Sequence, residues 1–255
     1  MEISPNDTAS SRSGAPQSKE IQEMFSGIAG RYDFLNRLLS LGIDTRWRKR
    51  CIKTLKQKMK TTGPILDLAA GTGDLALALE KRMGVAFPVI AADFSHEMLK
   101  ILKRKKGTQK RISIVTADGL SLPFKPDTFA GATIGFGIRN FTDRPAALAE
   151  LYRVLRPGGI LAILEFSIPE NWLFRLTYLF YFEKILPLIG GIFSSRSAYT
   201  YLPESVRKFP PPETFSGLIR GAGFSRVESV PLTGGIAFLY TAEKPTTTGP
   251  SGKTR

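Results

Sequence analysis

The sequence predicts an α/β fold in which a mostly parallel sheet lies between two layers of helices. Short apolar segments alternate with helical segments along most of the chain, which is typical of parallel sheets whose crossover connections are helices. The first apolar segment, residues 65–68, runs into a glycine-rich turn at residues 70–73 that opens a helix. A short Gly-Gly turn joins the last two apolar segments, and we expect these to pair antiparallel. The predicted architecture is Rossmann-like and seven-stranded, with an antiparallel last strand.

Seven segments have the apolar character of buried strands. They are residues 65–68, 89–92, 112–116, 128–135, 160–164, 227–230 and 236–241. Helical patterns begin between them at Leu75, at Ser95, whose hydroxyl is placed to cap its helix, and at Arg144. We expect the helix from Arg144 to stop at the Pro-Gly-Gly sequence of residues 157–159. A further helix is expected over residues 212–223.

The chain is expected to hold one ordered domain between two tails. A length of 255 residues suits a single α/β domain with additions. We place this domain at residues 20–244, with helices and polar breaks over residues 20–60. Residues 1–19 and 245–255 are rich in small polar residues and proline, so we expect them to be disordered.

An aromatic, apolar insertion at residues 171–200 breaks the alternation of strands and helices. A transmembrane helix needs about 20 mainly apolar residues. Arg175, Glu183, Lys184 and Pro187 interrupt the segment, so a buried or interfacial element fits better.

Composition limits the kinds of chemistry available. The only cysteine, Cys51, excludes an internal disulfide, and the only histidine, His96, argues against a histidine metal site or a histidine-based triad. We therefore predict no metal site. The net charge of +14 fits contact with nucleic acid, contact with an anionic membrane surface, or simply a basic surface that limits aggregation. No secretory signal is visible at the N-terminus.

The glycine turn indicates a nucleotide-type pocket, and the acids around it indicate which ligand. Gly71-x-Gly73-x-x-Ala76 formally matches the dinucleotide fingerprint. However, Asp67 lies inside the end of the preceding strand, where it would repel a pyrophosphate and attract a cationic amino group. S-adenosylmethionine carries an ammonium and a sulfonium but no phosphate. We therefore predict that Asp67, Gly71 and Gly73 bind S-adenosylmethionine.

Two further acids follow the next strands. Asp93 comes twenty residues after Gly73 and can accept both ribose hydroxyls. Asp118 follows the third strand and is placed to bind the adenine amino group, with the Gly119 N–H available to a ring nitrogen. The carboxyl ends of the strands in open α/β sheets are where ligands bind.

Several motifs resemble known families. Asp-Leu-Ala-Ala-Gly-Thr-Gly-Asp at residues 67–74 and Ala-Asp-Phe-Ser-His-Glu-Met-Leu at residues 92–99 resemble class I S-adenosylmethionine-dependent methyltransferases. Three narrower blocks, joined by Gly-Phe-Gly-Ile-Arg-Asn at residues 135–140, resemble the ubiquinone/menaquinone biosynthesis C-methyltransferases. These blocks are residues 32–47, 152–167 and 199–206. The resemblance runs from about residue 20 to residue 243. The chain departs from the family pattern at Asp44, where a histidine is usual, and at Gly135, where a serine is usual.

The resemblance implies a reaction and a site. The implied substrate is a polyprenylated quinol, most often demethylmenaquinol, methylated on a ring carbon. Thr72, Asp93, Asp118, Gly119 and Gly135 stand at positions that contact the cofactor in the family. We interpret Arg139 and Asn140, just past the fourth strand, as the catalytic pair, with Arg139 as a sheet ion-pair partner as the alternative. Five residues are candidates for closing over the substrate, with helix packing or capping as the alternative: Tyr32, Asp33, Asn36, Tyr199 and Tyr201.

The polyprenyl tail gives the aromatic insertion and the positive charge a use. We expect a cytoplasmic protein bound peripherally at the inner face of the membrane. The insertion is otherwise an ordinary buried helix or the contact of a homodimer. Rival interpretations are methylation of a benzoquinol in the ubiquinone pathway, of RNA or of another small molecule, and a peripheral binding protein without catalysis. We predict no nucleic-acid partner, because the basic residues are not interleaved with aromatic ones.

Overall fold

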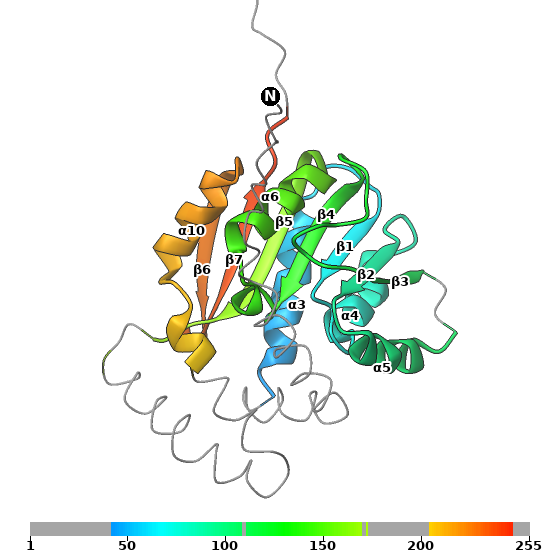
Figure 1. Cartoon of the computed structure of the whole chain (residues 1–255), viewed down its shortest axis with the longest axis horizontal. Helices are drawn as coiled ribbons and strands as arrows, with labels where there is room; N and C mark the ends of the chain where they lie inside the picture. Colours follow the sequence, from blue (N-terminus) through cyan, green and yellow to red (C-terminus); the bar gives the residue numbers. More distant parts are fainter. Residues whose placement is uncertain (1–41, 109–110, 170–171, 173–203, 247–255) are drawn as a thin grey trace, which may run out of the picture.

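A seven-stranded sheet forms the centre of the computed structural model, which describes residues 42–108, 111–169, 172 and 204–246 (Figure 1). The strands run in the order β3-β2-β1-β4-β5-β7-β6. Their bounds are β1 Ile65–Leu68, β2 Val89–Asp93, β3 Ile112–Thr116, β4 Phe129–Gly135, β5 Leu155–Phe166, β6 Ser225–Leu232 and β7 Ala237–Glu243.

Strand pairing confirms the predicted fold class. The pairs from β3 through to β5 are all parallel. The last strand, β7, is antiparallel to both β5 and β6. The chain order reverses between β1 and β4, because β2 and β3 lie on one side of this pair and β5 on the other. Ligands of open α/β sheets bind beyond the carboxyl ends of the strands at such a switch point.

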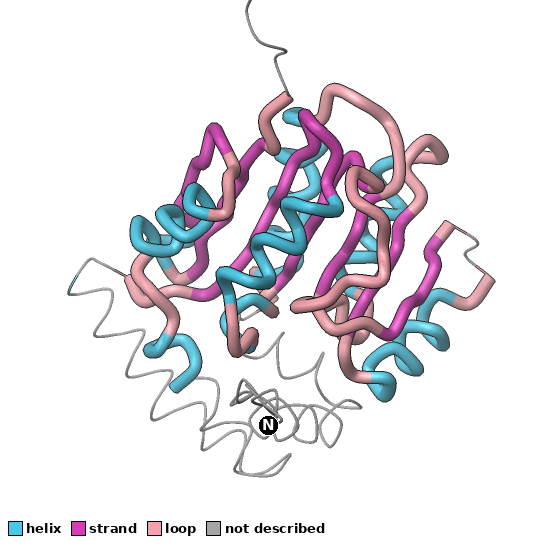
Figure 2. The backbone as a smooth tube through the Cα atoms, turned by 45° about the horizontal axis from the view of Figure 1, so that its top comes forward, coloured by secondary structure: helices cyan, strands magenta, loops and turns pink. Residues whose placement is uncertain are grey.

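Helices cover both faces of the sheet (Figure 2). The helices α3 (Asp44–Lys58), α4 (Asp74–Met83) and α5 (His96–Lys106) contribute to one hydrophobic core. The helices α6 (Arg144–Val154) and α10 (Pro212–Gly221) contribute to the other. Ser95 caps α5 as expected, since its hydroxyl accepts a hydrogen bond from the Met98 N–H. The central strand β1 contributes to both cores, with Ile65 in the first and Leu66 and Leu68 in the second.

The main difference from the expected elements concerns β5. The strand begins at Leu155 rather than at residue 160, because Leu155 already pairs with Phe129 of β4. The Pro-Gly-Gly sequence that was expected to follow a helix therefore lies within the strand, beside a register shift between Phe129 and Gly131. Apart from Trp172, the aromatic insertion lies outside the described residues. So do residues 20–41, the tail at residues 1–19 and most of the second tail.

In the part of the chain that the structure describes, no helix is both long enough and apolar enough to cross a membrane.

Candidate cofactor and active site

The glycine turn brings the end of β1 close to the start of α4. Ala69, Gly71 and Gly73 all have positive φ, at 54°, 55° and 87°. This conformation is nearly free of cost only for glycine. A Cβ at Gly73 would also overlap the side chain of Leu102 in α5. The turn is therefore both tightly folded and tightly packed, and it leaves the first turn of α4 facing the end of β1.

Asp67 presents a buried carboxylate inside this turn. The residue is 1% exposed, and its Oδ1 accepts a hydrogen bond of 2.7 Å from the Thr133 hydroxyl of β4. Its Oδ2 has no hydrogen-bond partner among the described residues. Burial raises the pKa of Asp67 to about 7, with a further contribution from the Asp93 charge. The Thr133 hydrogen bond, the Arg48 charge and the nearby Ala76 N–H oppose this shift, but the Ala76 N–H makes no hydrogen bond to Oδ2. A buried acceptor without a donor is costly, so this oxygen suits a cationic donor supplied by a ligand.

Asp93 fixes the glycine turn from the neighbouring strand. Its Oδ2 accepts a hydrogen bond of 2.7 Å from the Gly71 N–H, and its Oδ1 accepts one of 2.8 Å from the Ser95 N–H. Burial raises the pKa of Asp93, although these backbone donors oppose the shift. Each oxygen keeps acceptor capacity for one more donor. Asp93 therefore orders the turn and can still receive two ribose hydroxyls.

Asp118 and Gly119 lie at the carboxyl end of β3 in a tight turn. Asp118 is exposed, and its Oδ1 accepts a hydrogen bond of 2.9 Å from the Leu120 N–H. Gly119 is buried, and a Cβ there would overlap the ring of Phe141. The glycine thus allows the chain after β3 to approach the segment that follows β4.

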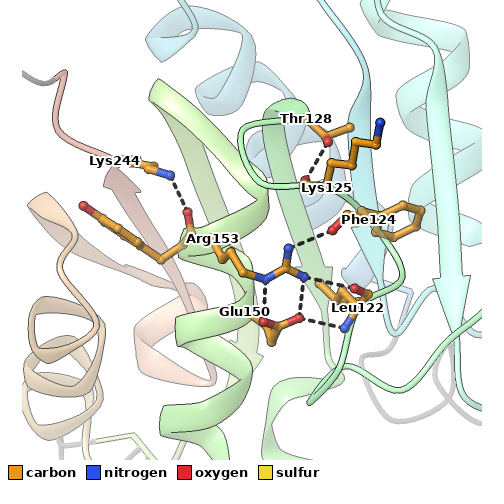
Figure 3. A network of polar contacts seen from close by, with 8 residues as sticks. Leu122, Phe124, Lys125, Thr128, Glu150, Arg153 and Lys244 are labelled. Atoms are coloured by element: carbon orange, nitrogen blue, oxygen red, sulfur yellow. Dashed lines mark hydrogen bonds and ion pairs between the residues drawn. The ribbon is translucent and has the colours of Figure 1, made fainter.

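An ion pair on α6 holds the chain that continues from this turn (Figure 3). The guanidinium of Arg153 donates to the carbonyls of Leu122 and Phe124 at 3.0 and 2.7 Å. Glu150 accepts from the Leu122 N–H at 2.7 Å and from Arg153 at 2.7 Å. The pKa of Glu150 is lowered, mainly by the hydrogen bond that it accepts from Arg153. The pair therefore fixes the backbone at Leu122 and Phe124, a few residues beyond Asp118 and Gly119.

Charged groups from three helices meet at the glycine turn. Asp74, the first residue of α4, accepts a hydrogen bond of 2.9 Å from the Lys105 ammonium of α5. Its other carboxylate oxygen lies 3.9 Å from the Arg48 guanidinium of α3. Lys105 also donates to the Thr72 hydroxyl at 3.1 Å. Arg48 pairs with Asp44, the residue that replaces the histidine usual in the family. Asp44 therefore serves as the acidic partner of a buried ion pair at the start of α3.

The carboxyl end of β4 carries the residues predicted to act on the substrate. Gly135 ends the strand, and a Cβ there would lie 3.1 Å from Leu75 Cδ2, so the missing side chain makes room for α4. Phe136 follows with φ of 61°, an outlier for a bulky residue. Arg139 and Asn140 lie in the short helix η2 (Ile138–Asn140). The two predicted catalytic residues are thus held just beyond a strained bend.

Arg139 is itself buried and paired. It is 5% exposed, and its Nη1 donates to Glu165 Oε1 at 2.8 Å and to the Phe136 carbonyl. Its guanidinium also lies over the Phe166 ring, 5.5 Å from the centroid. The ion pair in the sheet that was the alternative interpretation therefore exists. If Arg139 acts on the substrate, it does so while it is paired with Glu165.

Three residues of the site did not stand out in the sequence. Glu165 directly follows the strand expected over residues 160–164, and an acid at a strand end was the signal that could have found it. Arg48 resembles part of a solvated basic run. Phe94 follows Asp93 and is 42% exposed, which is unusual for a large apolar side chain and was visible as an aromatic after an acid. The five substrate-closure candidates, Tyr32, Asp33, Asn36, Tyr199 and Tyr201, lie outside the described residues.

The acids at the ends of β1, β2 and β3 fit one kind of ligand. The unpaired Oδ2 of Asp67 suits an ammonium, and its buried negative charge opposes a phosphate at the same place. In the described part of the chain, no group of three or more metal-binding side chains occurs. Together the fold and this site define a class I S-adenosylmethionine-dependent methyltransferase.

The model of the ubiE/COQ5 methyltransferase family matches residues 14–244, and the chain belongs to this family. The chain is 48% identical over 89% of its length to a ubiquinone/menaquinone biosynthesis C-methyltransferase UbiE of Geotalea daltonii, covering 97% of that protein. It is 48% identical over 87% of its length to the whole of a demethylmenaquinone methyltransferase of Thermus thermophilus. A crystal structure of a SAM-dependent methyltransferase from Aquifex aeolicus shares the fold. Its TM-score is 0.53 at 22% identity, over 75% of this chain and 88% of that one.

Asp67→Asn tests the proposed ammonium site. The variant should weaken S-adenosylmethionine binding by about tenfold to a hundredfold, the effect of losing a charged hydrogen bond. Without ligand, it should be more stable than the wild type at pH 8. The raised pKa means that folded Asp67 keeps a proton that the unfolded chain releases between about pH 4 and 7. Wild-type stability therefore falls by a few kcal/mol as pH rises through that window.

Titration calorimetry and urea unfolding at pH 5 and pH 8 measure both effects. Asp127→Asn is a matched control, because Asp127 is an exposed acid that pairs with Lys244 away from the site. Equal S-adenosylmethionine affinity in Asp67→Asn and the wild type would contradict the assignment.

Arg153→Met tests the role of the pair on α6. Removing the guanidinium frees the carbonyls of Leu122 and Phe124 and loosens the turn at Asp118. The dissociation constant for S-adenosylmethionine should rise by about threefold to thirtyfold, a typical effect of one lost network, while the rate at saturating cofactor stays near the wild-type value. Arg220→Met is the control, because Arg220 forms an exposed pair with Glu213 on α10. Unchanged cofactor affinity in Arg153→Met would show that the pair does not position the turn.

Proposed function

We propose that the protein methylates a ring carbon of a polyprenylated quinol, with demethylmenaquinol as the acceptor and S-adenosylmethionine as the donor. The observation that carries this proposal is the near full-length similarity to proteins named demethylmenaquinone methyltransferase, at 48% and 42% identity. Asp67 supports the donor, because its unpaired, buried carboxylate oxygen matches the ammonium of S-adenosylmethionine.

When bound, S-adenosylmethionine would supply an electrophilic methyl group to a ring carbon of the acceptor and leave as S-adenosylhomocysteine, and the proton displaced from that carbon would pass to solvent. The chain's own residues hold the donor for this step. Asp67 binds the ammonium, Asp93 the ribose hydroxyls, and Asp118 with Gly119 the adenine. Gly71 and Gly73 allow the backbone to approach closely. Alignment of donor and acceptor contributes about 7 to 11 kcal/mol in favourable cases.

Arg139 and Asn140 are proposed to act on the acceptor. Both follow β4, at the switch point of the sheet where the methyl group would lie. A quinolate is a stronger carbon nucleophile than a quinol, and a nearby guanidinium favours the ionised form. Asn140 offers an amide to orient the reacting hydroxyl. His96 lies at the start of α5, which makes it a poor general base for this position. Tyr32, Asp33, Asn36, Tyr199 and Tyr201 are proposed to close over the ring.

The proposal includes peripheral binding to the membrane, because a prenyl tail resides in the bilayer. The last turn of α5 carries four basic residues, Lys103, Arg104, Lys105 and Lys106. Lys105 reaches Thr72 and Asp74, so this basic turn borders the glycine turn of the site. Trp172, after β5, is 69% exposed. Basic residues attract anionic lipid, and tryptophan favours the interface.

The activity is tested with the purified protein, S-adenosylmethionine and a short-chain demethylmenaquinol kept reduced. Release of S-adenosylhomocysteine should match formation of the methylated quinol, measured by mass spectrometry. Asn140→Ala should lower kcat at least about tenfold, a modest share of what orientation contributes, with cofactor affinity unchanged. Gln57→Ala, an amide change on the exposed side of α3, should have no effect. Absence of methylated quinol in the wild-type reaction would contradict the proposed function.

Membrane binding is tested by flotation with phosphatidylglycerol vesicles and with phosphatidylcholine vesicles. The wild type should float with the anionic vesicles only, and less so as salt rises. Lys103→Glu with Arg104→Glu should abolish flotation. The control makes the same charge change on α3, Lys53→Glu with Lys56→Glu, where Lys56 lies near the end of α4 instead. Equal flotation of all three proteins would contradict a specific role for the α5 turn.

A further inference from the structure

Glu165 is a buried carboxylate at the carboxyl end of β5, beside the residues proposed to act on the acceptor. It precedes Phe166, the last residue of the strand, and is 0% exposed. Side chains alternate along a strand, so Glu165 shares a face with Leu161 and Ile163, which pack with α6 and α10. A charge in such a place is costly unless it is paired and hydrogen-bonded.

The Glu165 carboxylate accepts hydrogen bonds from both the backbone N–H and the guanidinium of Arg139. Its Oε1 accepts from Arg139 Nη1 at 2.8 Å and from the Phe166 N–H at 2.9 Å. Its Oε2 accepts from the Arg139 backbone N–H at 3.1 Å. One carboxylate thus ties the start of η2 to the end of β5. Because Phe166 also lies under the guanidinium, the orientation of the Arg139 head group is fixed from β5.

The pair also changes the charge that Arg139 offers. A carboxylate 2.8 Å from the guanidinium, in a site this buried, cancels much of the field of the cation at longer range. A quinolate placed near Arg139 therefore meets the dipole of an ion pair rather than an isolated positive charge. The shift that Arg139 imposes on the quinol pKa is correspondingly smaller than a lone arginine would cause.

Two other titratable or charged groups face this pair among the described residues. Tyr240 of β7 has its pKa raised by burial first and then by the charge of Glu165. Arg144, at the start of α6, donates to the Arg139 carbonyl at 2.8 Å. Neither removes the carboxylate charge, because Tyr240 stays protonated at neutral pH and the Arg144 bond reaches the backbone of Arg139. Among the described residues, Glu165 is therefore the acid that pairs with the Arg139 head group.

We propose that Glu165 is a positioning residue for methyl transfer, which orients Arg139 and limits the charge that Arg139 presents to the acceptor. The inference rests on the proposed function for its catalytic part. A purely structural ion pair would also stabilise the fold, so the decisive readout is the pH dependence of the rate. Glu165→Gln keeps the shape of the side chain and removes only its charge.

Unfolding of the ligand-free protein first tests the coupling of the two residues. Arg139→Met and Glu165→Gln should each lower the urea midpoint, because each leaves one buried charge without its partner. The double variant should have a midpoint above that of Arg139→Met alone. Glu150→Gln, which removes an acid from the Arg153 pair instead, should not rescue Arg139→Met. Additive losses in the double variant would overturn the proposed coupling.

The rate is then measured in single turnovers with the short-chain demethylmenaquinol, between pH 6 and pH 9. In Glu165→Gln, the rising limb of the rate should move to lower pH by about one unit, since the uncancelled guanidinium favours the quinolate. The maximal rate should fall about tenfold or more, a loss of orientation, while S-adenosylmethionine affinity stays within twofold. Glu165→Asp keeps the charge, so its limb should stay at the wild-type pH. If Glu165→Gln does not fold, the comparison of Arg139→Met with the double variant decides the question. A double variant that unfolds at or below the urea midpoint of Arg139→Met overturns the inference.

Two results of the rate measurement would overturn the inference. One is a lower rate in Glu165→Gln whose rising limb stays at the wild-type pH, and the other is a pH–rate profile of the wild type that has no rising limb. Failure of the proposed function looks different. In that case the wild type forms no methylated quinol at any pH, while the coupling of Arg139 with Glu165 in the unfolding experiment persists.

Discussion

The buried carboxylate of Asp67 is the constraint on which the cofactor end of this structure depends. It lies inside β1 with one oxygen bonded to Thr133 and the other without a partner among the described residues. Such a group is destabilising in the ligand-free protein, and burial holds its pKa near 7. Its position is useful only for a ligand that brings a cation. In the proposed function, the negative charge of Asp67 favours an ammonium over a phosphate.

Hydrogen bonds and ion pairs between neighbouring helices, strands and turns organise the rest of the site. Asp93 of β2 accepts a hydrogen bond from the Gly71 N–H, so the acid proposed to bind the ribose is tied to the glycine turn. Asp74 links α4 to Lys105 and faces Arg48. On the other side, Glu150 and Arg153 fix the chain that follows Asp118 (Figure 3).

The acceptor side follows a different physical logic. The Arg139 guanidinium is buried in the described structure. It pairs with Glu165 and lies over the Phe166 ring, both on β5. Strain at Phe136, with φ of 61°, lies directly between β4 and η2. The two halves of the site are thus prepared differently. The donor half presents an unsatisfied charge, and the acceptor half presents a charge that is already compensated.

The fold could be predicted from the sequence because its signals are local, and so could the grouping of Asp67, Asp93 and the glycine turn at one edge of the sheet. Apolar segments of strand length, the glycine turn and an acid after each of three strands all occur as short motifs. The early start of β5 was not predictable, because Pro157 and two glycines normally end an element and only the pairing of Leu155 with Phe129 overrides them. The pairing of Glu165 with Arg139 was not predictable either, although an acid at the end of a strand was visible. Its partner Arg139 is 26 positions away, and only the sheet brings them together.

The most direct test of this account is the pKa of Asp67 itself, measured by carbon-detected NMR on protein labelled at the aspartate carboxyl carbons. In the free protein the carboxyl should titrate near pH 7. With saturating S-adenosylhomocysteine, which carries the same ammonium, it should remain ionised down to at least about two units lower, as expected beside an opposite charge. An Asp67 pKa that is the same with and without the ligand would contradict the claim that this carboxylate binds the ammonium of the cofactor.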